Sequence, residues 1–229
     1  MTGEFLQGGR KSRALTQQAA AARLGISQPY LALLESGQRR VPAKLARKAA
    51  HLYGMPLSAL PVEMGWSEPP RCEVGEMAAD LAGLGYPGLA YLRPAKKRNP
   101  AEVLLTALSC EDLESRLTEA LPWVVLEYAD LDWNWLVRAS KVHNLQNRLG
   151  FVTSMGRHLA EQSGNQCVAS ALRQQESTLE RCRLVQEDTL CHRSLSEAEK
   201  RWLREYRPAE ARHWNLLTDL SPEHLTYAA

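Results

Sequence analysis

The sequence predicts an all-α protein with two domains. Apolar residues recur at helical spacing through most of the 229 residues, and no segment shows the sustained two-residue alternation of paired strands. A segment rich in proline and glycine, residues 62–75, follows a short first part and precedes a longer second part. We therefore expect a small helical domain over residues 1–61, a linker, and a larger helical domain over residues 76–229.

Residues 15–40 read LTQQAAAARLGISQPYLALLESGQRR, a pattern typical of two short helices joined by a tight turn. Thr16 can cap the first helix, because its hydroxyl can accept a backbone N–H of the first turn. Gly25 falls where this helix should end, and glycine adopts a left-handed conformation without a Cβ clash. Ser27 can cap the second helix, and Pro29 lies in its first turn, where a missing N–H costs nothing. This pattern predicts a helix-turn-helix, whose second helix lies in the DNA major groove.

Small residues support a close crossing of these two helices. The run Ala19–Ala22 supplies them, since helices that cross steeply need small side chains at their contact. Leu31 and Leu34 should face the first helix, which leaves the outer face of the second helix to Gln28, Pro29, Ala32 and Leu33. An ordinary alanine-rich hairpin is the alternative, and the caps, the turn and the basic exit loop together favour the helix-turn-helix.

Residues 5–61 resemble the Xre family of helix-turn-helix domains, the class of the lambdoid phage Cro and cI repressors. The matching motifs are LTQ at 15–17, LGIS at 24–27, QPYL at 28–31 and LESGQRR at 34–40. A further helix over Pro42–Tyr53 and the run 54–60 would complete the five-helix pattern of a lambda-repressor-like domain. Gly8 and Gly9 depart from that pattern, and we expect the first helix to be short or frayed there because glycine weakens helices.

The resemblance implies a set of DNA contacts. Gln17 would touch a phosphate from the start of its helix, and Gln28 would reach a base edge, most naturally adenine. Arg39 and Arg40 would neutralise phosphates or enter the minor groove. Leu33 could make only apolar contact, for example with a thymine methyl group. The full set of implied DNA-binding residues is Thr16, Gln17, Ser27, Gln28, Pro29, Tyr30, Leu33, Arg39 and Arg40.

Two further consequences come from the resemblance. The family often pairs an arginine of the first helix with the glutamate before the exit loop, which implies an ion pair between Arg10 and Glu35. The outer face of the second helix has few hydrogen-bonding groups besides Gln28 and Tyr30. We therefore expect modest direct readout, supplemented by the shape of the DNA.

The charge distribution independently supports a nucleic-acid partner. Residues 1–61 contain nine Lys and Arg but only two Asp and Glu, whereas the rest of the chain carries 19 basic and 24 acidic residues. A basic head on an acidic body is typical of a DNA-binding domain joined to a separate regulatory domain. No apolar run approaches the roughly 20 residues that cross a bilayer, and no signal peptide is evident. Five cysteines without framework spacing favour reduced thiols and a cytoplasmic location.

Helix signals continue through the second domain. Its predicted starts are Asn99 with Pro100, Ser109 with Asp112 three residues on, Asp130, and the capping box of Ser196 and Glu199. Pro122 should end the second of these helices. The third should run from Asp130 to Val152, since its apolar residues stay close to helical spacing throughout.

Several groups in the second domain could carry chemistry, and for each a plainer interpretation is favoured. The aromatic cluster Trp123, Tyr128, Trp133 and Trp135 should be core rather than a ligand pocket. The polar run 143–148 should be a solvated helix face rather than a partner surface or a buried hydrogen-bond network. Lys96, Lys97 and Arg98 should form a solvated loop rather than a DNA-backbone contact. Cys182, Cys191 and His192 lack the tight spacing of structural zinc ligands. No catalytic motif is present, so we expect no catalytic residue, metal site or cofactor.

These observations predict a cytoplasmic, non-enzymatic, DNA-binding transcriptional regulator. It would bind paired operator half-sites as a homodimer, more naturally as a repressor, with no membrane partner. An antitoxin that represses its own operon and binds a toxin through residues 76–229 is a special case. The alternatives are a ligand- or metal-responsive sensor, and an enzyme with a tethered helix-turn-helix. The sequence does not indicate the operator, the effector or the partner.

Overall fold

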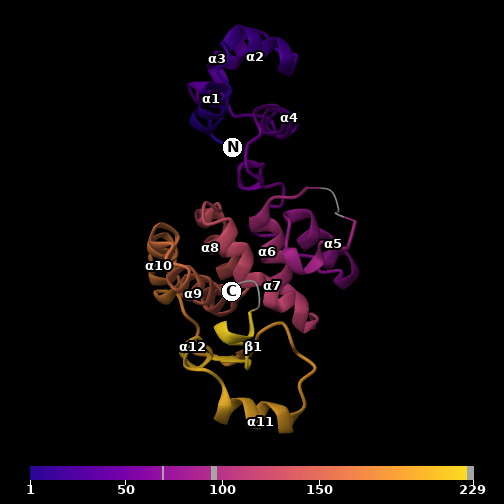
Figure 1. Ribbon diagram of the computed structural model, residues 1–229, viewed down its shortest axis with the longest axis vertical. Helices are drawn as coiled ribbons and strands as arrows, with labels where there is room; N and C mark the ends of the chain where they lie inside the picture. The colour runs from indigo at the N-terminus through magenta and orange to yellow at the C-terminus, as the bar shows by residue number, and fades with distance from the viewer. Residues whose placement is uncertain (69, 94–96, 226–229) are drawn as a thin grey trace. The chain divides into compact units, whose positions relative to one another are not determined.

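The computed structural model describes residues 1–68, 70–93 and 97–225, without the side chain of Val74. The chain divides into a small unit, Met1–Glu63, and a large unit, Met64–Ala229. Each unit has its own packed helices (Figure 1). Lys96 of the predicted basic loop lies outside the described residues. Arg98 of that loop forms an ion pair with the buried carboxylate of Asp80 instead of standing free in solvent.

The small unit consists of five helical segments. They are α1 (Gly3–Ser12), α2 (Gln17–Leu24), α3 (Gln28–Glu35), α4 (Ala43–Tyr53) and the 3-10 turn η1 (Leu57–Ala59). The predicted caps are present: Thr16 Oγ1 accepts the N–H of Ala19 at 3.1 Å, and Ser27 Oγ accepts that of Tyr30 at 3.4 Å. Gly25 ends α2 in the left-handed conformation with φ 74°. The structure therefore confirms the helix-turn-helix that these local signals predict.

A single apolar core holds the small unit together. Its fully or nearly fully buried members include Leu6, Ala20, Ala21, Leu24, Leu31, Leu34 and Tyr53. The expectation that α1 frays at its glycine pair was wrong, because the helix runs through both residues. Gly9 is buried, and a Cβ there would lie 2.8 Å from Met55 Sδ and 3.1 Å from Tyr53 Cδ2. The glycine thus lets α1 pack closely on the end of α4, and this packing outweighs its weak helix propensity.

The large unit is a helical bundle extended by a short parallel strand pair. Its helices are α5 (Val74–Leu84), η2 (Pro87–Leu89), α6 (Pro100–Ser109), α7 (Ser115–Glu127), α8 (Trp133–Val142), α9 (Gln146–Gln162), α10 (Gln166–Glu180), α11 (Glu197–Tyr206), α12 (Ala209–His213) and η3 (Pro222–His224). Strands β1 (Asp188–Thr189) and β2 (Leu216–Leu217) pair in parallel. The all-α class is confirmed, since these short strands and one isolated bridge are the only strand pairing among the described residues. Helix α9 is central and packs on α7, α8, α10 and α12 (Figure 1).

No helix in the described part of the chain is both long enough and apolar enough to span a membrane.

Two of the predicted helix boundaries in the large unit are correct. Asn99 caps α6, its Oδ1 accepting the N–H of Ala101 at 2.8 Å. Ser196 and Glu199 form the expected capping box at the start of α11. Both signals act within one helical turn, which is why the sequence alone identifies them.

The predicted start at Ser109 and stop at Pro122 were both wrong. Ser109 is the last residue of α6, and α7 begins at Ser115. Asp112 caps no helix, because its Oδ1 accepts the N–H and the hydroxyl of Ser194, 82 residues away in the chain. Pro122 lies inside α7 and is buried. Close packing of α7 on α9 compensates there for the backbone hydrogen bond that proline cannot donate.

The single helix predicted from Asp130 to Val152 is two helices. Helix α8 ends at Val142 and α9 begins at Gln146, with Asn144 in the left-handed region at φ 56°. The cap of α8 is Asp132 rather than Asp130, since Asp132 Oδ1 accepts the N–H of Trp135. Apolar spacing continues across the turn because both helices bury residues in the same core, so periodicity alone could not reveal the break.

Asn147 and Arg148 of the polar run 143–148 form a hydrogen-bond network inside the large unit, so the favoured solvated face was wrong for these residues, whereas Asn144 is exposed. Asn147 is 2% exposed, and its amide donates to the carbonyl of Leu184 at 2.9 Å and accepts its N–H at 2.8 Å. Arg148 forms two hydrogen bonds with Asp188, at 2.7 and 2.9 Å, and donates to the carbonyl of Leu108. These contacts connect α9 to the chain before β1, to β1 itself and to the end of α6.

Two of the four residues of the aromatic cluster belong to the core, as predicted, and the other two, Tyr128 and Trp135, are half-buried. Trp123 and Trp133 are buried, and Trp123 contacts the rings of Tyr86 and Tyr128. The hydroxyl of Tyr128 donates to the carbonyl of Leu84 at 2.7 Å, and burial raises the pKa of this phenol to about 12. The two buried indoles and the Tyr128 hydrogen bond act in packing.

The cysteines are not all reduced, contrary to expectation. Cys72 and Cys110 form a disulfide that joins the segment before α5 to the end of α6. The two residues are 38 positions apart with no motif around either, so only folding reveals the pair. Cys167, Cys182 and Cys191 are free, and complete burial raises the pKa of the Cys191 thiol to about 11.

Candidate DNA-binding face

Helix α3 presents one side to the core and the other to solvent. Leu31 and Leu34 are fully buried in the core of the small unit, where α3 packs on α1 and α2, and this packing fixes the rotation of the helix. Exposure then follows the predicted outer face: Ser27, Gln28 and Pro29 are exposed, and Tyr30, Ala32 and Leu33 are half-buried. Thr16, Arg39 and Arg40 are exposed as well, and Gln17 is half-buried. All nine residues implied as DNA-binding therefore lie on or around the solvent side of α2 and α3.

A buried ion pair lies beneath this face, as the family resemblance implies. Arg10 of α1 donates from Nε to Glu35 Oε1 at 2.6 Å and from Nη2 to Oε2 at 2.9 Å. The residues are 8% and 4% exposed. A third guanidinium hydrogen bond, from Nη1 to the carbonyl of Leu15, fixes the loop before α2. The predicted pair is thus confirmed and joins α1, α2 and the end of α3.

Glutamine side chains extend this pair to the surface. Gln17 Nε2 donates to Glu35 Oε2 at 2.9 Å, and Gln28 Nε2 donates to Gln17 Oε1 at 3.1 Å. The sequence interpretation treated the two glutamines separately, because no local spacing links residues eleven positions apart on different helices. In the structure, Arg10, Glu35, Gln17 and Gln28 form one continuous chain of polar contacts.

This chain orients the amide of Gln28. One of its two N–H groups is used on Gln17, which leaves a second N–H and the amide oxygen. An N–H donor beside a carbonyl acceptor is the combination that matches the N7 and N6 groups of adenine in the major groove. The arrangement can therefore present a fixed donor and acceptor to a base edge without further ordering of the side chain.

The charge state of Glu35 follows from its neighbours. Burial alone would raise the pKa of this carboxyl group, but hydrogen bonds from Arg10 and Gln17 and the positive charge of Arg10 outweigh burial and lower the pKa. The hydrogen bond with Glu35 correspondingly raises the pKa of Arg10. Both groups are ionised at neutral pH, so the chain of contacts begins at a charged pair.

The cations of the small unit divide into structural and free ones. Arg13 donates to the carbonyl of Tyr53 at 2.6 Å, and Lys48 donates to the carbonyl of Leu24 at 2.8 Å. By contrast, the side chains of Arg39 and Arg40 make no hydrogen bond or ion pair with any described residue. The loop after α3 therefore presents two cations whose charge no neighbouring side chain neutralises.

The capped helices, the left-handed turn and the shared core define a helix-turn-helix domain. Residues 9–60 match the family model described as helix-turn-helix, and this segment is a helix-turn-helix domain of the Xre type. Domains of this family bind DNA in transcription regulators, so the match supports DNA binding by residues 9–60. The match ends before the large unit. No curated protein and no solved structure matches the chain.

Proposed function

We propose that the protein is a transcriptional repressor that binds two operator half-sites as a homodimer. The observation that carries the proposal is the chain from Arg10 and Glu35 through Gln17 to Gln28, which presents an oriented amide at the exposed start of α3. One helix of eight residues contacts few base pairs. Domains of this kind therefore read two half-sites about one turn of DNA apart.

Each face residue has a role in this proposal. Gln28 contacts a base edge, and Pro29 and Leu33 make apolar contact beside it. Thr16, Gln17 and Ser27 lie at the starts of α2 and α3, where backbone N–H groups attract phosphate. Tyr30 adds a hydroxyl group, and Arg39 and Arg40 neutralise phosphates. A cytoplasmic location is part of this proposal, because operator DNA is the proposed target.

The test is selection of binding sites from random DNA with the full chain, followed by footprinting. We expect an inverted repeat whose half-sites are centred about 10 base pairs apart, or a multiple of this spacing. Enrichment of one unpaired half-site would contradict the dimer. A selected pool without any common sequence would contradict a sequence-specific repressor.

Replacing Gln28 by alanine should weaken binding to the selected site by about 1–3 kcal/mol, because the oriented donor and acceptor are removed. Binding to random DNA should change little, since phosphate contacts remain. A titration with both DNAs measures the difference, with Gln174→Ala on the exposed side of α10 as the matched control. Equal losses on both DNAs would exclude a base-reading role for Gln28.

Replacing both Arg39 and Arg40 by alanine should weaken binding to specific and random DNA alike. The slope of log affinity against log salt should become shallower by about one to two units, one for each phosphate that is no longer neutralised. The double variant Arg181→Ala and Arg212→Ala carries the same change in net charge on exposed residues of the large unit. If both double variants change the slope equally, the effect comes from overall charge and not from the loop after α3.

The large unit supplies the dimer contacts in this proposal, and an antitoxin that binds a toxin through this unit remains a special case of it. The alternative, a ligand- or metal-responsive sensor with its effector site in the large unit, stays a prediction of the sequence.

A further inference from the structure

The large unit has two hollows of about 400 and 840 Å³, and Trp202 lines both of them. They adjoin, since both are lined by Trp202, Asp219 and His224. Tyr206 and Glu223 complete the wall of the larger hollow. We call the two hollows together the α11 groove. Their size admits several residues of an extended peptide.

An exposed aromatic pair lines the α11 groove. Trp202 is 51% exposed and Tyr206 is 59% exposed, although α11 is well anchored by its capping box and by buried Leu203. The two ring centroids are 5.3 Å apart with an interplanar angle of 33°. Adjacent large rings left in water on an ordered helix are typical of a contact surface, because their burial against a partner is strongly favourable.

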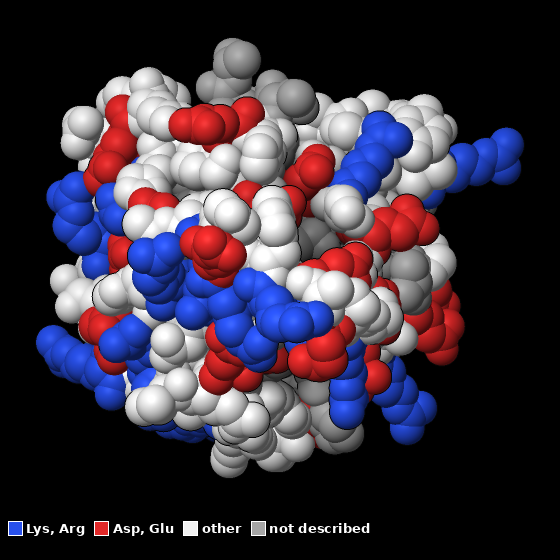
Figure 2. Space-filling view, turned by 90° about the horizontal axis from the view of Figure 1, so that it is seen from below, with Lys and Arg blue, Asp and Glu red and all other residues white. Residues whose placement is uncertain are grey.

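Negative charge lines the α11 groove. Six carboxylates contribute to the walls: Glu119, Glu161, Glu199, Glu210, Asp219 and Glu223. Among the described lining residues there is no Lys or Arg, although basic residues are as frequent as acidic ones in the whole chain. Figure 2 shows both signs of charge interspersed over the face seen from the α11 end. The excess of negative charge is therefore a property of the groove lining and not of the whole face.

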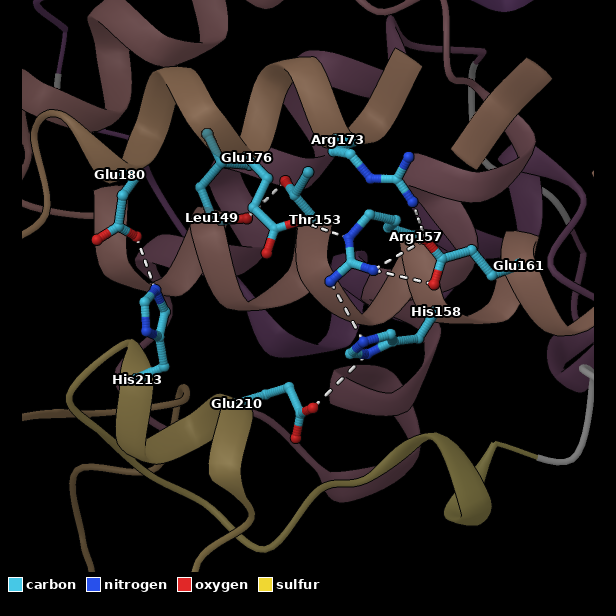
Figure 3. A network of polar contacts seen from close by, with 10 residues as sticks. All are labelled: Leu149, Thr153, Arg157, His158, Glu161, Arg173, Glu176, Glu180, Glu210 and His213. Atoms are coloured by element: carbon cyan, nitrogen blue, oxygen red, sulfur yellow. Dashed lines mark hydrogen bonds and ion pairs between the residues drawn. The ribbon is translucent and has the colours of Figure 1, made fainter. Parts of the chain in front are cut away.

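The walls are held in place by polar contacts between α9, α10 and α12. His158 Nδ1 lies 3.9 Å from Glu210 Oε1, and His213 Nε2 lies 2.7 Å from Glu180 Oε2, so that two histidine–carboxylate pairs hold α12 (Figure 3). Glu161 of the wall is neutralised by Arg157 and Arg173. Asp219 and Glu223, by contrast, have no side-chain partner among the described residues. Their uncompensated carboxylates face the same hollow as the aromatic pair.

We propose that the α11 groove binds an arginine-bearing peptide segment of a partner protein. A guanidinium group stacks on the Trp202 and Tyr206 rings and pairs with the carboxylates of Asp219 and Glu223. Arginine fits better than lysine, because its planar group combines ring stacking with bidentate carboxylate pairing. DNA is disfavoured, since its phosphates would meet the acidic lining. The site lies wholly within the large unit, so it does not depend on the proposed repressor function.

The test is fluorescence polarisation of a labelled nine-residue peptide of alternating arginine and glycine, titrated with the full chain. We expect saturable binding, and none with the peptide in which citrulline replaces arginine. Trp202→Ala should weaken binding about tenfold through loss of the stacked ring. Asp219→Asn with Glu223→Gln, which preserves side-chain shape, should weaken it by a similar factor. Glu205→Gln with Glu127→Gln removes the same charge from exposed positions outside the groove and should change affinity less than twofold.

Three results would overturn the proposal. They are absence of saturable binding, equal binding of the citrulline peptide, and equal losses in the groove and control double variants. Sedimentation of the full chain tests whether a second copy of the protein, and not a partner peptide, covers the groove. If a second copy does so, Trp202→Ala will dissociate a dimer. DNA binding is not used in any of these measurements, so failure of the repressor proposal would leave the result intact.

Discussion

Replacing Glu35 by alanine should lower the free energy of unfolding of the small unit by about 3–5 kcal/mol. The substitution leaves the guanidinium of Arg10 buried beneath α3 without its carboxylate, and an uncompensated buried charge is far more costly than a broken surface ion pair. Hydrogen exchange of the α1 and α3 amides in the full chain measures the change for this unit alone. Glu4→Ala, an exposed glutamate on α1, is the control and should change stability by less than about 0.5 kcal/mol.

A double variant distinguishes the buried charge from reduced packing. Arg10→Met with Glu35→Leu removes both charges while keeping apolar bulk, and it should recover much of the stability. A Glu35→Ala cost below about 1 kcal/mol would mean that water reaches Arg10 and that the pair is not a structural centre. Specific DNA binding should fall in the double variant even where stability recovers, since Gln17 loses the carboxylate that orients it.

The same pair predicts the pH dependence of the small unit. The pKa of Glu35 is lower in the folded protein than the value of about 4.3 for an unfolded glutamate. The carboxylate of Glu35 therefore contributes to the free energy of unfolding above the unfolded pKa. This contribution is lost as pH falls through the lower folded pKa. Acid unfolding should show this loss in the wild type but not in the variant with Arg10→Met and Glu35→Leu.

Replacing Cys72 by serine should lower the free energy of unfolding of the large unit by about 2–4 kcal/mol. The disulfide closes a loop between positions 38 residues apart, and cutting it returns conformational freedom to the unfolded chain. The effect is measured by unfolding the full chain in urea and monitoring the hydrogen exchange of the α6 amides. A dithiol reductant should reproduce it in the wild type.

Controls separate the disulfide from general thiol effects. Cys167→Ser alters an exposed free thiol and should leave the unfolding midpoint unchanged. Reductant should have no further effect on Cys72→Ser. Equal midpoints for oxidised and reduced wild type would show that the pair contributes nothing to stability. Cys191 should not exchange with the disulfide in the native state, because burial keeps its thiol protonated and inaccessible.

The disulfide also changes the basis of the predicted location. The cytoplasmic prediction used cysteine spacing as one argument, and the Cys72–Cys110 pair removes it, since disulfides are uncommon in the cytosol. The helix-turn-helix is the remaining argument, because operator DNA is its partner in the proposed function.

Much of the small unit was predictable because its signals are local. Thr16 and Ser27 cap helices through backbone groups three residues away, and Gly25 ends α2 in a conformation that glycine adopts at low cost. The prediction that α1 frays at its glycine pair was wrong because Gly9 packs closely on Met55, more than 40 residues away in the chain. The link from Gln17 to Gln28 was missed for the same reason.

The large unit shows where such reasoning ends. Pro122 is tolerated inside α7 by packing on α9, and Asn147 and Arg148 find partners at Leu184 and Asp188. None of these partners lies within a helical turn. Local propensity therefore predicts the helices but not their breaks or their buried polar groups.

The helical class and the helix-turn-helix can be predicted from the amino-acid sequence alone, because caps, turns and apolar spacing act over about one to three turns. The orientation of Gln28, the pairing of Cys72 with Cys110 and the place of Trp202 in the walls of two acid-lined hollows are visible only in the folded protein. Those features depend on contacts between residues that folding brings together from distant parts of the chain. Their energies come from burial and from the pairing of buried groups, which no short stretch of sequence contains.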